Sequence, residues 1–210
     1  MQSSSISEEN EIDRVHLTYS DEQLVEKFKA GDRDSFRILV ERYKSRVYNI
    51  IYGIMGSRDE AEDLSQEVFL NVYRFLHRFK EKSKFYTWLY RIAVNICLSA
   101  QKKKNKSSNV LSLTELSETD NTSGKMELAD QSFSSQKKLE DMELARKIKS
   151  AINSLSEVLK ATFALREFED LSYQELAKIF QCSKGTIKSR LSRAREELRQ
   201  KLKLYLIEGK

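Results

Sequence analysis

The sequence predicts an all-α protein of two small helical domains, a helical bundle and a helix-turn-helix, joined by a flexible linker. The chain of 210 residues contains no proline and six glycines, although proline and glycine mark the tight turns of β proteins. Apolar residues recur every three or four positions through most of the chain, which is the spacing of one helix face. Ser residues followed three positions later by Glu or Gln mark helix starts.

The periodicity predicts four helices in the first half of the chain and four in the second. They are expected near residues 22–30, 33–53, 58–79, 86–104, 136–152, 155–168, 172–180 and 184–206. Gly31, Gly53 and Gly56 indicate breaks between the early helices. Capping boxes, in which a Ser hydroxyl and a Glu or Gln side chain satisfy each other's backbone N–H groups, are predicted at four starts: Ser20 with Gln23, Ser57 with Glu60, Ser154 with Glu157, and Ser172 with Glu175.

Charge divides the chain into two basic blocks and two acidic segments. The first block (20–105) and the second block (136–210) each carry 17 basic residues, against 12 and 11 acidic ones. The segments 1–19 and 106–135 each have a net charge of −3, so the whole chain has +5. Segment 106–135 is rich in Ser, Thr, Asn and Asp without sustained periodicity, which predicts a flexible acidic linker, and 1–19 is expected to be a mobile tail.

Several function classes are excluded by the residues that the sequence lacks. Phosphate-binding, dinucleotide-binding and hydrolase motifs are absent, so we expect no enzyme activity, no catalytic residue and no cofactor. Cys97, Cys182, His16 and His77 lack metal-ligand spacing, so we expect no metal and two thiols without a redox role. The sequence shows neither a signal peptide nor an apolar run long enough for membrane insertion, which indicates a cytoplasmic protein.

The end of the second block has the form of a DNA-reading helix-turn-helix. A short helix from Tyr173 to Phe180 precedes a three-residue turn and a basic helix for which Ser183 is the predicted N-cap. Apolar residues form one buried stripe on that helix: Ile187, Leu191, Ala194 and Leu198. Polar and basic side chains away from this stripe, in the first half of the helix, are expected to contact bases or phosphates: Lys184, Thr186, Lys188, Ser189, Arg190, Ser192 and Arg193. Arg195 is also assigned to phosphates.

The third predicted helix carries an acidic face with one apolar anchor. Asp59, Asp63 and Gln66 follow that face, which continues to Leu70 outside the main apolar stripe. Such a face suits a basic protein partner better than it suits DNA, although periodicity alone is equally consistent with a plain amphipathic helix.

The fourth predicted helix begins in a cluster of aromatic and basic residues. The cluster comprises Lys82, Lys84, Phe85, Tyr86, Trp88, Tyr90 and Arg91. Aromatic rings among positive charges suit single-stranded DNA, because exposed bases stack on rings while cations hold phosphates. Some rings are expected in the core, with Trp88 and Phe85 the first choices.

These segments together resemble the extracytoplasmic-function group of bacterial sigma-70 factors. The first block is similar to that family's region 2 through DEQLVEKFKAGDRDSFRILVERYKSRVYNI, DAEDLSQEVFLNVY and FYTWLYRIAVN. The second block is similar to region 4 through SLSEVLKATFALREFEDLSYQELAKIF and SKGTIKSRLSRAREELR. The resemblance covers about 85 residues of the first block and about 70 of the second, with the motifs in the family's order.

The resemblance implies partners and site residues. Core RNA polymerase is expected to bind through its β′ clamp and β subunits, promoter DNA is the second partner, and an anti-sigma factor is the third. The implied core-binding residues are Asp63, Gln66, Glu67 and Leu70. The implied minus-10 residues are Lys84, Phe85, Tyr86, Thr87, Trp88, Arg91 and Asn95. Lys188, Ser189 and Arg193 match positions that read the minus-35 element.

One departure from the family concerns the start of the sixth predicted helix. The family often has Leu-Pro where this chain has Leu155-Ser156, and Pro suits the first turn of a helix. We expect Ser154 with Glu157 to start that helix instead, with little loss of function.

Two rival functions use the same residues differently. A stand-alone helix-turn-helix regulator would act without core polymerase, but no ligand-sensing domain or dimerisation helix is evident and the first block would have no role. A protein that sequesters a polymerase subunit without reading DNA is disfavoured by the basic recognition helix.

Overall fold

The structure, a computed structural model, describes residues 19–80, 82–111 and 135–208, and within these ranges its regular secondary structure consists of helices joined by short turns. Residues 1–18 of the predicted tail and 112–134 of the predicted linker lie outside the described residues, whereas the carbonyl of Tyr19 accepts a hydrogen bond from Arg42. The described helices are α2 (Asp21–Lys29), α3 (Asp34–Met55), α4 (Arg58–Phe75), α5 (Phe85–Leu111), α6 (Ser135–Asn153), α7 (Glu157–Glu169), α8 (Tyr173–Phe180) and α9 (Lys184–Glu208). The all-α prediction is confirmed, and all eight expected helices are present.

The largest differences from the predicted bounds are at the ends of α4 and α5. The third predicted helix stops at Phe75 and is followed by a 3-10 turn from Leu76 to Arg78. Helix α5 continues to Leu111, several residues into the predicted linker. The predicted break at Gly53 is wrong, because α3 runs through it to Met55 and is capped by Gly56, whose φ of 79° is left-handed.

Helix α3 is the centre of the first block. It buries one continuous face against α4 and α5, formed by Tyr43, Val47, Ile50, Ile51 and Ile54. Polar contacts fix α2 beside α3, since Asp21 pairs with Arg42 at 2.5 Å and accepts a hydrogen bond from the Tyr43 hydroxyl. Burial, followed by that bond to a carboxylate, raises the pKa of Tyr43 well above its usual range, so the phenol stays a donor.

The second block contains the predicted helix-turn-helix. Helix α8 ends at Phe180 and is capped by Gln181, which adopts a left-handed conformation with φ 51°; α9 begins three residues after Gln181, at Lys184. The predicted α9 stripe is buried throughout, with Ile187, Leu191, Ala194 and Leu198 between 0% and 8% exposed. The first part of the stripe packs with α8, and its far end packs on Ala151 and Leu155.

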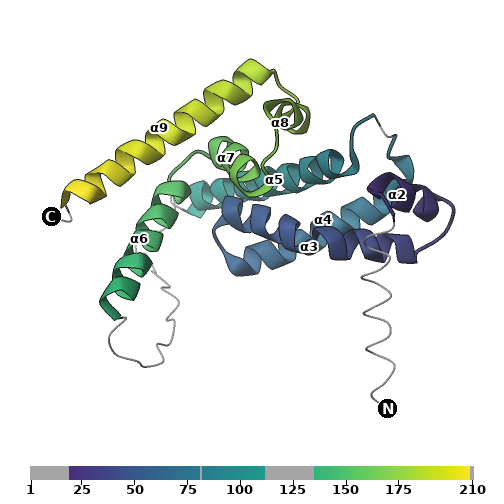
Figure 1. Ribbon diagram of the computed structural model, residues 1–210, viewed down its shortest axis with the longest axis horizontal. Coiled ribbons are helices and arrows are strands. Elements are labelled where there is room, and N and C mark those ends of the chain that lie inside the picture. Colours follow the sequence, from purple (N-terminus) through teal and green to yellow (C-terminus); the bar gives the residue numbers. More distant parts are fainter. Residues whose placement is uncertain (1–18, 81, 112–134, 209–210) are drawn as a thin grey trace, which may run out of the picture.

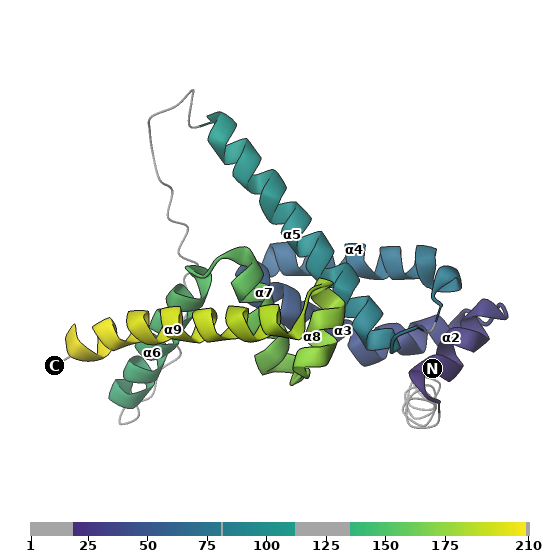
Figure 2. The ribbon, with the colours of Figure 1, turned by 90° about the horizontal axis from the view of Figure 1, so that it is seen from above.

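The two blocks lie against each other. Helix α7 rests on α3, and α8 lies beside the start of α5, while the far end of α5 projects away from the bundle (Figures 1 and 2). Buried residues of α7 such as Ala161 and Leu165 belong to the same apolar core as the first block. The sequence predicted two separate blocks, and this packing between them is a finding of the structure.

Two of the four predicted capping boxes form completely. At Ser20 and Ser172 both reciprocal bonds are present. The Ser57 hydroxyl also accepts from the Glu60 N–H, while the Glu60 carboxylate pairs with Lys104 of α5 at 3.1 Å.

The box predicted at Ser154 is wrong. Its hydroxyl donates to the Ala151 carbonyl at 2.6 Å, in the last turn of α6, and the N-cap of α7 is Ser156. Ser154 and Ser156 lie close together, and the position where α6 ends decides which of them is the N-cap of α7.

Replacing Ser172 should therefore destabilise the second block, whereas replacing Ser154 should have little effect. We expect Ser172→Ala to lower the free energy of unfolding by about 1 kcal/mol, because the backbone N–H of Glu175 loses its acceptor. Ser154→Ala is the matched control, since it removes a hydroxyl that caps no N–H group. Urea unfolding followed by circular dichroism measures both, and equal effects of the two substitutions would contradict the assignment.

Candidate nucleic-acid interface

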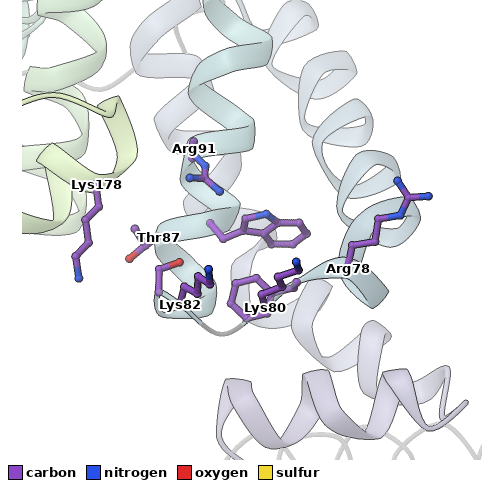
Figure 3. Close-up of a pocket in the computed structure, with 9 residues that line it drawn as sticks. Arg78, Lys80, Lys82, Thr87, Arg91 and Lys178 are labelled. Carbon is purple, nitrogen blue, oxygen red and sulfur yellow. The ribbon is translucent and has the colours of Figure 1, made fainter.

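A basic hollow opens beside the first turn of α5. It has a volume of about 450 Å³ and is lined by Arg78, Phe79, Lys80, Lys82, Ser83, Thr87, Trp88, Arg91 and Lys178. Cationic side chains surround its mouth, and Lys178 reaches it from α8 of the other block (Figure 3). An aromatic surface among cations is the arrangement that holds single-stranded nucleic acid, with bases on the ring and phosphates on the cations.

Trp88 is the aromatic surface of this hollow. It is half-buried, and its ring rests against the buried rings of Phe79 at 5.1 Å and Phe85 at 6.1 Å between centroids. The packing holds the indole in place, while its remaining exposed part faces the hollow. Arg91 and Thr87, both predicted minus-10 residues, line the hollow from the same helix, although Thr87 is only 5% exposed.

Phe85 requires a correction as a DNA contact. Its side chain is 1% exposed and packs between Tyr43, Phe79 and Trp88. A ring without a free face cannot stack on a base, so Phe85 positions Trp88 from behind. The sequence had already given Phe85 as a first choice for the core, and the structure favours that alternative.

Tyr86 points toward the second block. Its hydroxyl donates to the Glu175 carboxylate at the start of α8, and Lys84 lies over its ring at 5.8 Å. Burial and then the bond to Glu175 raise the pKa of Tyr86 to about 12, so the hydroxyl remains protonated at neutral pH. The same bond helps to lower the pKa of Glu175, after the larger contribution from Ser172.

Asn95 lies apart from the basic hollow. It is exposed and lines a neighbouring groove of about 660 Å³ between α4 and α5, together with Glu67 and Asn71. Trp88, Arg91 and Asn95 nevertheless share one face of α5, because they are spaced at three and four residues. The hollow and the groove therefore follow each other along this face, as a bound strand of nucleic acid requires.

The recognition face of α9 is open to solvent for most of its length. We define it as Lys184, Thr186, Lys188, Ser189, Arg190, Ser192 and Arg193, the residues that the sequence predicted for minus-35 contacts. Five of them are exposed, while Thr186 and Arg190 are half-buried. The Ser183 hydroxyl accepts from the Thr186 N–H at 3.1 Å, which confirms Ser183 as the cap of this helix.

Two arginines of α9 have partners within the second block. Arg190 lies over the Phe180 ring at 5.5 Å and reaches the Cys182 sulfur at 3.9 Å, so its guanidinium is steadied beside the turn. Arg195, also predicted as a phosphate contact, pairs with Glu167 of α7 at 3.2 Å. Arg195 thus contributes to the packing of α7 on α9 and must leave Glu167 to reach a phosphate.

Helix α4 presents the predicted protein-binding stripe to solvent. We call Asp63, Gln66, Glu67 and Leu70 the α4 stripe; all four are exposed, and Leu70 is 58% exposed. Ala61, Val68 and Val72 are buried on the opposite side of the helix. An exposed leucine among acidic and amide side chains is typical of a protein-binding surface.

Tyr73 extends this stripe, and sequence reasoning missed it. It follows Leu70 by three residues and is 41% exposed. Its ring packs edge-on against Phe28 at 5.5 Å and Phe36 at 5.1 Å, so the aromatic surface is held by α2 and α3. The helical spacing from Leu70 was the available signal, but Tyr73 also fits an ordinary apolar position.

Two cations of the hollow were also missed. Arg78 lines the hollow although it precedes the aromatic cluster in the sequence, and Lys178 comes from a distant segment. Nothing in the local spacing of the sequence indicates that Lys178 approaches α5.

The described residues contain no cluster of three or more His, Cys, Asp or Glu side chains able to hold a metal ion. Across the same ranges, none of the helices has the length and apolarity of a membrane span. Cys97 is buried in the core and Cys182 is half-buried at the turn before α9.

Family comparisons match both blocks. Residues 39–107 match the family model described as Sigma-70 region 2, and residues 145–198 match Sigma-70, region 4.

Curated relatives align with nearly the whole chain. The RNA polymerase sigma-H factor of Pseudomonas aeruginosa is 36% identical over 193 residues, which are 90% of this chain and 97% of that protein. The ECF RNA polymerase sigma-E factor of Escherichia coli K12 is 38% identical over 186 residues, which are 87% of this chain and 94% of that protein.

Solved structures share the fold. CnrH, solved with the cytosolic domain of CnrY, has a TM-score of 0.61 and 20% identity, with 88% of this chain and 97% of that chain covered. The sigma factor RpoE of Bartonella quintana, solved with the anti-sigma factor NepR, has a TM-score of 0.60 and 24% identity, with 80% and 96% covered.

The two cysteines should differ strongly in reactivity. Burial raises the pKa of the Cys97 thiol to about 12, so at pH 8 only about one molecule in ten thousand carries the reactive thiolate there. We expect Ellman's reagent at pH 8 to label Cys182 promptly and Cys97 only as the chain unfolds. Cys182→Ser should remove the prompt phase and Cys97→Ser should keep it. Two prompt thiols per native chain would contradict this expectation.

Proposed function

The chain belongs to the extracytoplasmic-function group of the sigma-70 family, and from that premise we propose how its surfaces divide the work of promoter-specific initiation. The α4 stripe binds core RNA polymerase, the α5 face holds the minus-10 strand, and the recognition face of α9 reads the minus-35 element. The observation that carries this division is the exposure of three chemically different surfaces on one chain: an acidic stripe with an apolar anchor, a basic aromatic hollow and a basic helix face.

The α4 stripe is proposed to contact the clamp of the β′ subunit. Its exposed carboxylates suit a basic partner, and Leu70 supplies an apolar contact near the centre. We include Tyr73 in this surface, because its ring is exposed and already held by Phe28 and Phe36. A ring fixed before binding loses little rotamer freedom when the partner arrives. The second block is proposed to contact the β subunit.

The basic hollow is proposed to receive a base that leaves the promoter duplex. Extruding a base costs a few kcal/mol, and stacking on a side-chain ring returns about 1–3 kcal/mol. Trp88 offers that ring, while Lys80, Lys82 and Arg91 surround it with charge for the phosphates on either side. Asn95 is proposed to meet the next part of the strand in the α4–α5 groove, where its amide can hydrogen-bond a base edge.

The recognition face is proposed to enter the major groove at the minus-35 element. Lys188, Ser189 and Arg193 point away from the buried α9 stripe, so they can reach base edges while the stripe stays in the core. Arg190, steadied over Phe180, is proposed to contact a phosphate and fix the register of the helix.

We propose in addition that an anti-sigma factor controls the chain in the cytoplasm, and that the chain performs no reaction of its own. Support comes from RpoE of B. quintana, a sigma factor of the same fold that was solved bound to the anti-sigma factor NepR. The domain limits proposed for these roles are region 2 over 20–105, the linker over 106–135 and region 4 over 136–210.

A stand-alone helix-turn-helix regulator is not favoured as an alternative. It would leave the region 2 match over residues 39–107 without a role, together with the exposed α4 stripe. A purely sequestering protein is disfavoured in turn by the exposed basic face on α9.

Run-off transcription with purified core polymerase and a library of promoter fragments tests the proposal. Core-dependent initiation from a specific subset of promoters is the expected result. Tight, specific binding of the free protein at physiological salt, without core, would instead support the stand-alone regulator.

Reversing one charge on the α4 stripe should weaken polymerase binding. We expect Asp63→Lys to lower affinity for core polymerase at least tenfold, which is about 1.4 kcal/mol, because a cation then faces a basic partner. Fluorescence anisotropy of labelled protein titrated with core measures this. Glu22→Lys makes the same charge change on exposed α2 and should bind normally. Equal losses for both variants would show a general charge effect rather than a docking stripe.

Removing a base-reading side chain from α9 should change promoter choice. Arg193→Ala should cost about 1–3 kcal/mol on promoters with the preferred base at one minus-35 position and relax the preference there. Run-off transcription from promoters that carry each of the four bases at that position measures the change. A uniform loss across all four bases would reassign Arg193 to a phosphate contact.

A further inference from the structure

The cations around the basic hollow have no acidic partners within the described ranges. Five of them line it: Arg78, Lys80, Lys82, Arg91 and Lys178. No carboxylate stands among the described residues of the lining, and none of the five cations forms an ion pair with a described carboxylate. Arg195, by contrast, pairs with Glu167. Because like charges this close repel one another, the hollow favours an anionic occupant.

The beginning of the chain carries the complementary charge. Residues 1–18 lie outside the described residues, and their acidic side chains are Glu8, Glu9, Glu11 and Asp13, against the single basic residue Arg14. We call residues 8–13 the acidic segment. An extended peptide advances about 3.4 Å per residue, so four charges over six residues approach the spacing of phosphates along one nucleic-acid strand.

Helix α2, where the described chain begins, lies on the side of the molecule that carries the hollow. It packs against the 3-10 turn that ends at Arg78, one of the hollow's cations. Both views of the ribbon place α2 away from α9 and away from the lysine-rich far end of α5 (Figures 1 and 2). Among these basic surfaces, the hollow is therefore the nearest to the start of α2.

A series of contacts sets the distance from α2 to the hollow. The Asp21 carboxylate accepts from the Tyr43 hydroxyl, and the Tyr43 ring lies 5.5 Å from the Phe85 ring. The Phe85 ring lies 6.1 Å from the Trp88 ring, so the Asp21 carboxylate is within about 20 Å of Trp88. Between six and eleven residues separate the acidic segment from Tyr19, a reach of up to about 20 to 37 Å. The segment can therefore reach the hollow without any movement of the helices.

We propose that the acidic segment binds the basic hollow of its own chain, where its carboxylates take the places of DNA phosphates. One consequence rests on the function proposed above: the segment competes with the minus-10 strand for the hollow. Because the segment is tethered, it acts at an effective concentration of the order of millimolar, and weak ion pairs suffice to hold it. A single strand displaces it by adding bases that stack on Trp88.

A cross-link locates the segment in the full chain. Asn10→Cys with Ser83→Cys, in a Cys182→Ser background, keeps all four carboxylates and places one thiol in the segment and the other in the hollow. Lys102→Cys instead of Ser83→Cys is the matched control, because position 102 is exposed on α5 about 20 Å beyond Trp88. We expect mild oxidation to link positions 10 and 83 at least ten times faster than positions 10 and 102. Salt at about 0.5 M should remove the difference, because it screens the ion pairs.

Neutralising the segment tests the competition. The neutral-segment variant combines Glu8→Gln, Glu9→Gln, Glu11→Gln and Asp13→Asn. Fluorescence anisotropy without core polymerase, at about 50 mM salt, measures its binding to a labelled oligonucleotide of about ten thymidines. We expect binding at least fivefold tighter than that of the parent protein. The linker control makes the same change of charge through Glu115→Gln, Glu118→Gln, Glu127→Gln and Asp120→Asn, and should bind as the parent does.

Equal cross-linking at positions 83 and 102 would overturn the proposal. Disulfide-linked dimers in place of the monomeric product would overturn it as well, because they would assign the hollow to the segment of a second copy. Where Trp88→Ala weakens oligonucleotide binding, a neutral-segment variant that binds no tighter than the linker control would also contradict it. Failure of the proposed function looks different, because Trp88→Ala would then leave oligonucleotide binding unchanged although positions 10 and 83 still cross-link.

Discussion

Helix α5 buries Phe85, Leu89, Ala93 and Cys97 in one line, and each of these side chains is at most 1% exposed. Since one face of the helix is fixed in the core, the positions beside that line must turn outward, and they carry Trp88, Arg91 and Asn95. The same helix contacts α3, α4, α7 and α8, so its orientation sets both the proposed minus-10 surface and the place where the second block rests. A shift of one residue in this register would turn the helix by about 100° and carry Trp88 and Arg91 away from the hollow.

Helix positions were predictable because the apolar spacing is strong and local. The α9 stripe, the two complete capping boxes and the exposed α4 stripe follow from spacing within about ten residues. The errors arise where a local signal has two interpretations. Ser154 and Ser156 both precede α7, and only the end of α6 decides between them. A glycine such as Gly53 predicts a break in a helix, but here it lies where α7 approaches α3 closely.

The residues of the candidate site that share one helical face were predicted from the sequence. Those that tertiary contacts bring from other elements were missed. Trp88 and Arg91 share a face of α5, so their proximity follows from the sequence. Lys178 joins them from a segment almost ninety positions later, through packing that no local pattern encodes. Phe85 was assigned to both the core and the DNA surface, because an aromatic residue suits either one. Its burial depends on Phe79 and Tyr43, which approach it from other elements.

The contact between the blocks and the proposed DNA surfaces use one kind of chemistry. Both blocks are basic, and carboxylates of the second block meet the first block where they pack together. Glu175 accepts from the Tyr86 hydroxyl, yet Trp88 and Arg91 still line the hollow, and five residues of the recognition face remain exposed. Because Glu169 and Glu175 lie at the contact, they offset the repulsion between two basic blocks, and the outward face of α9 stays basic.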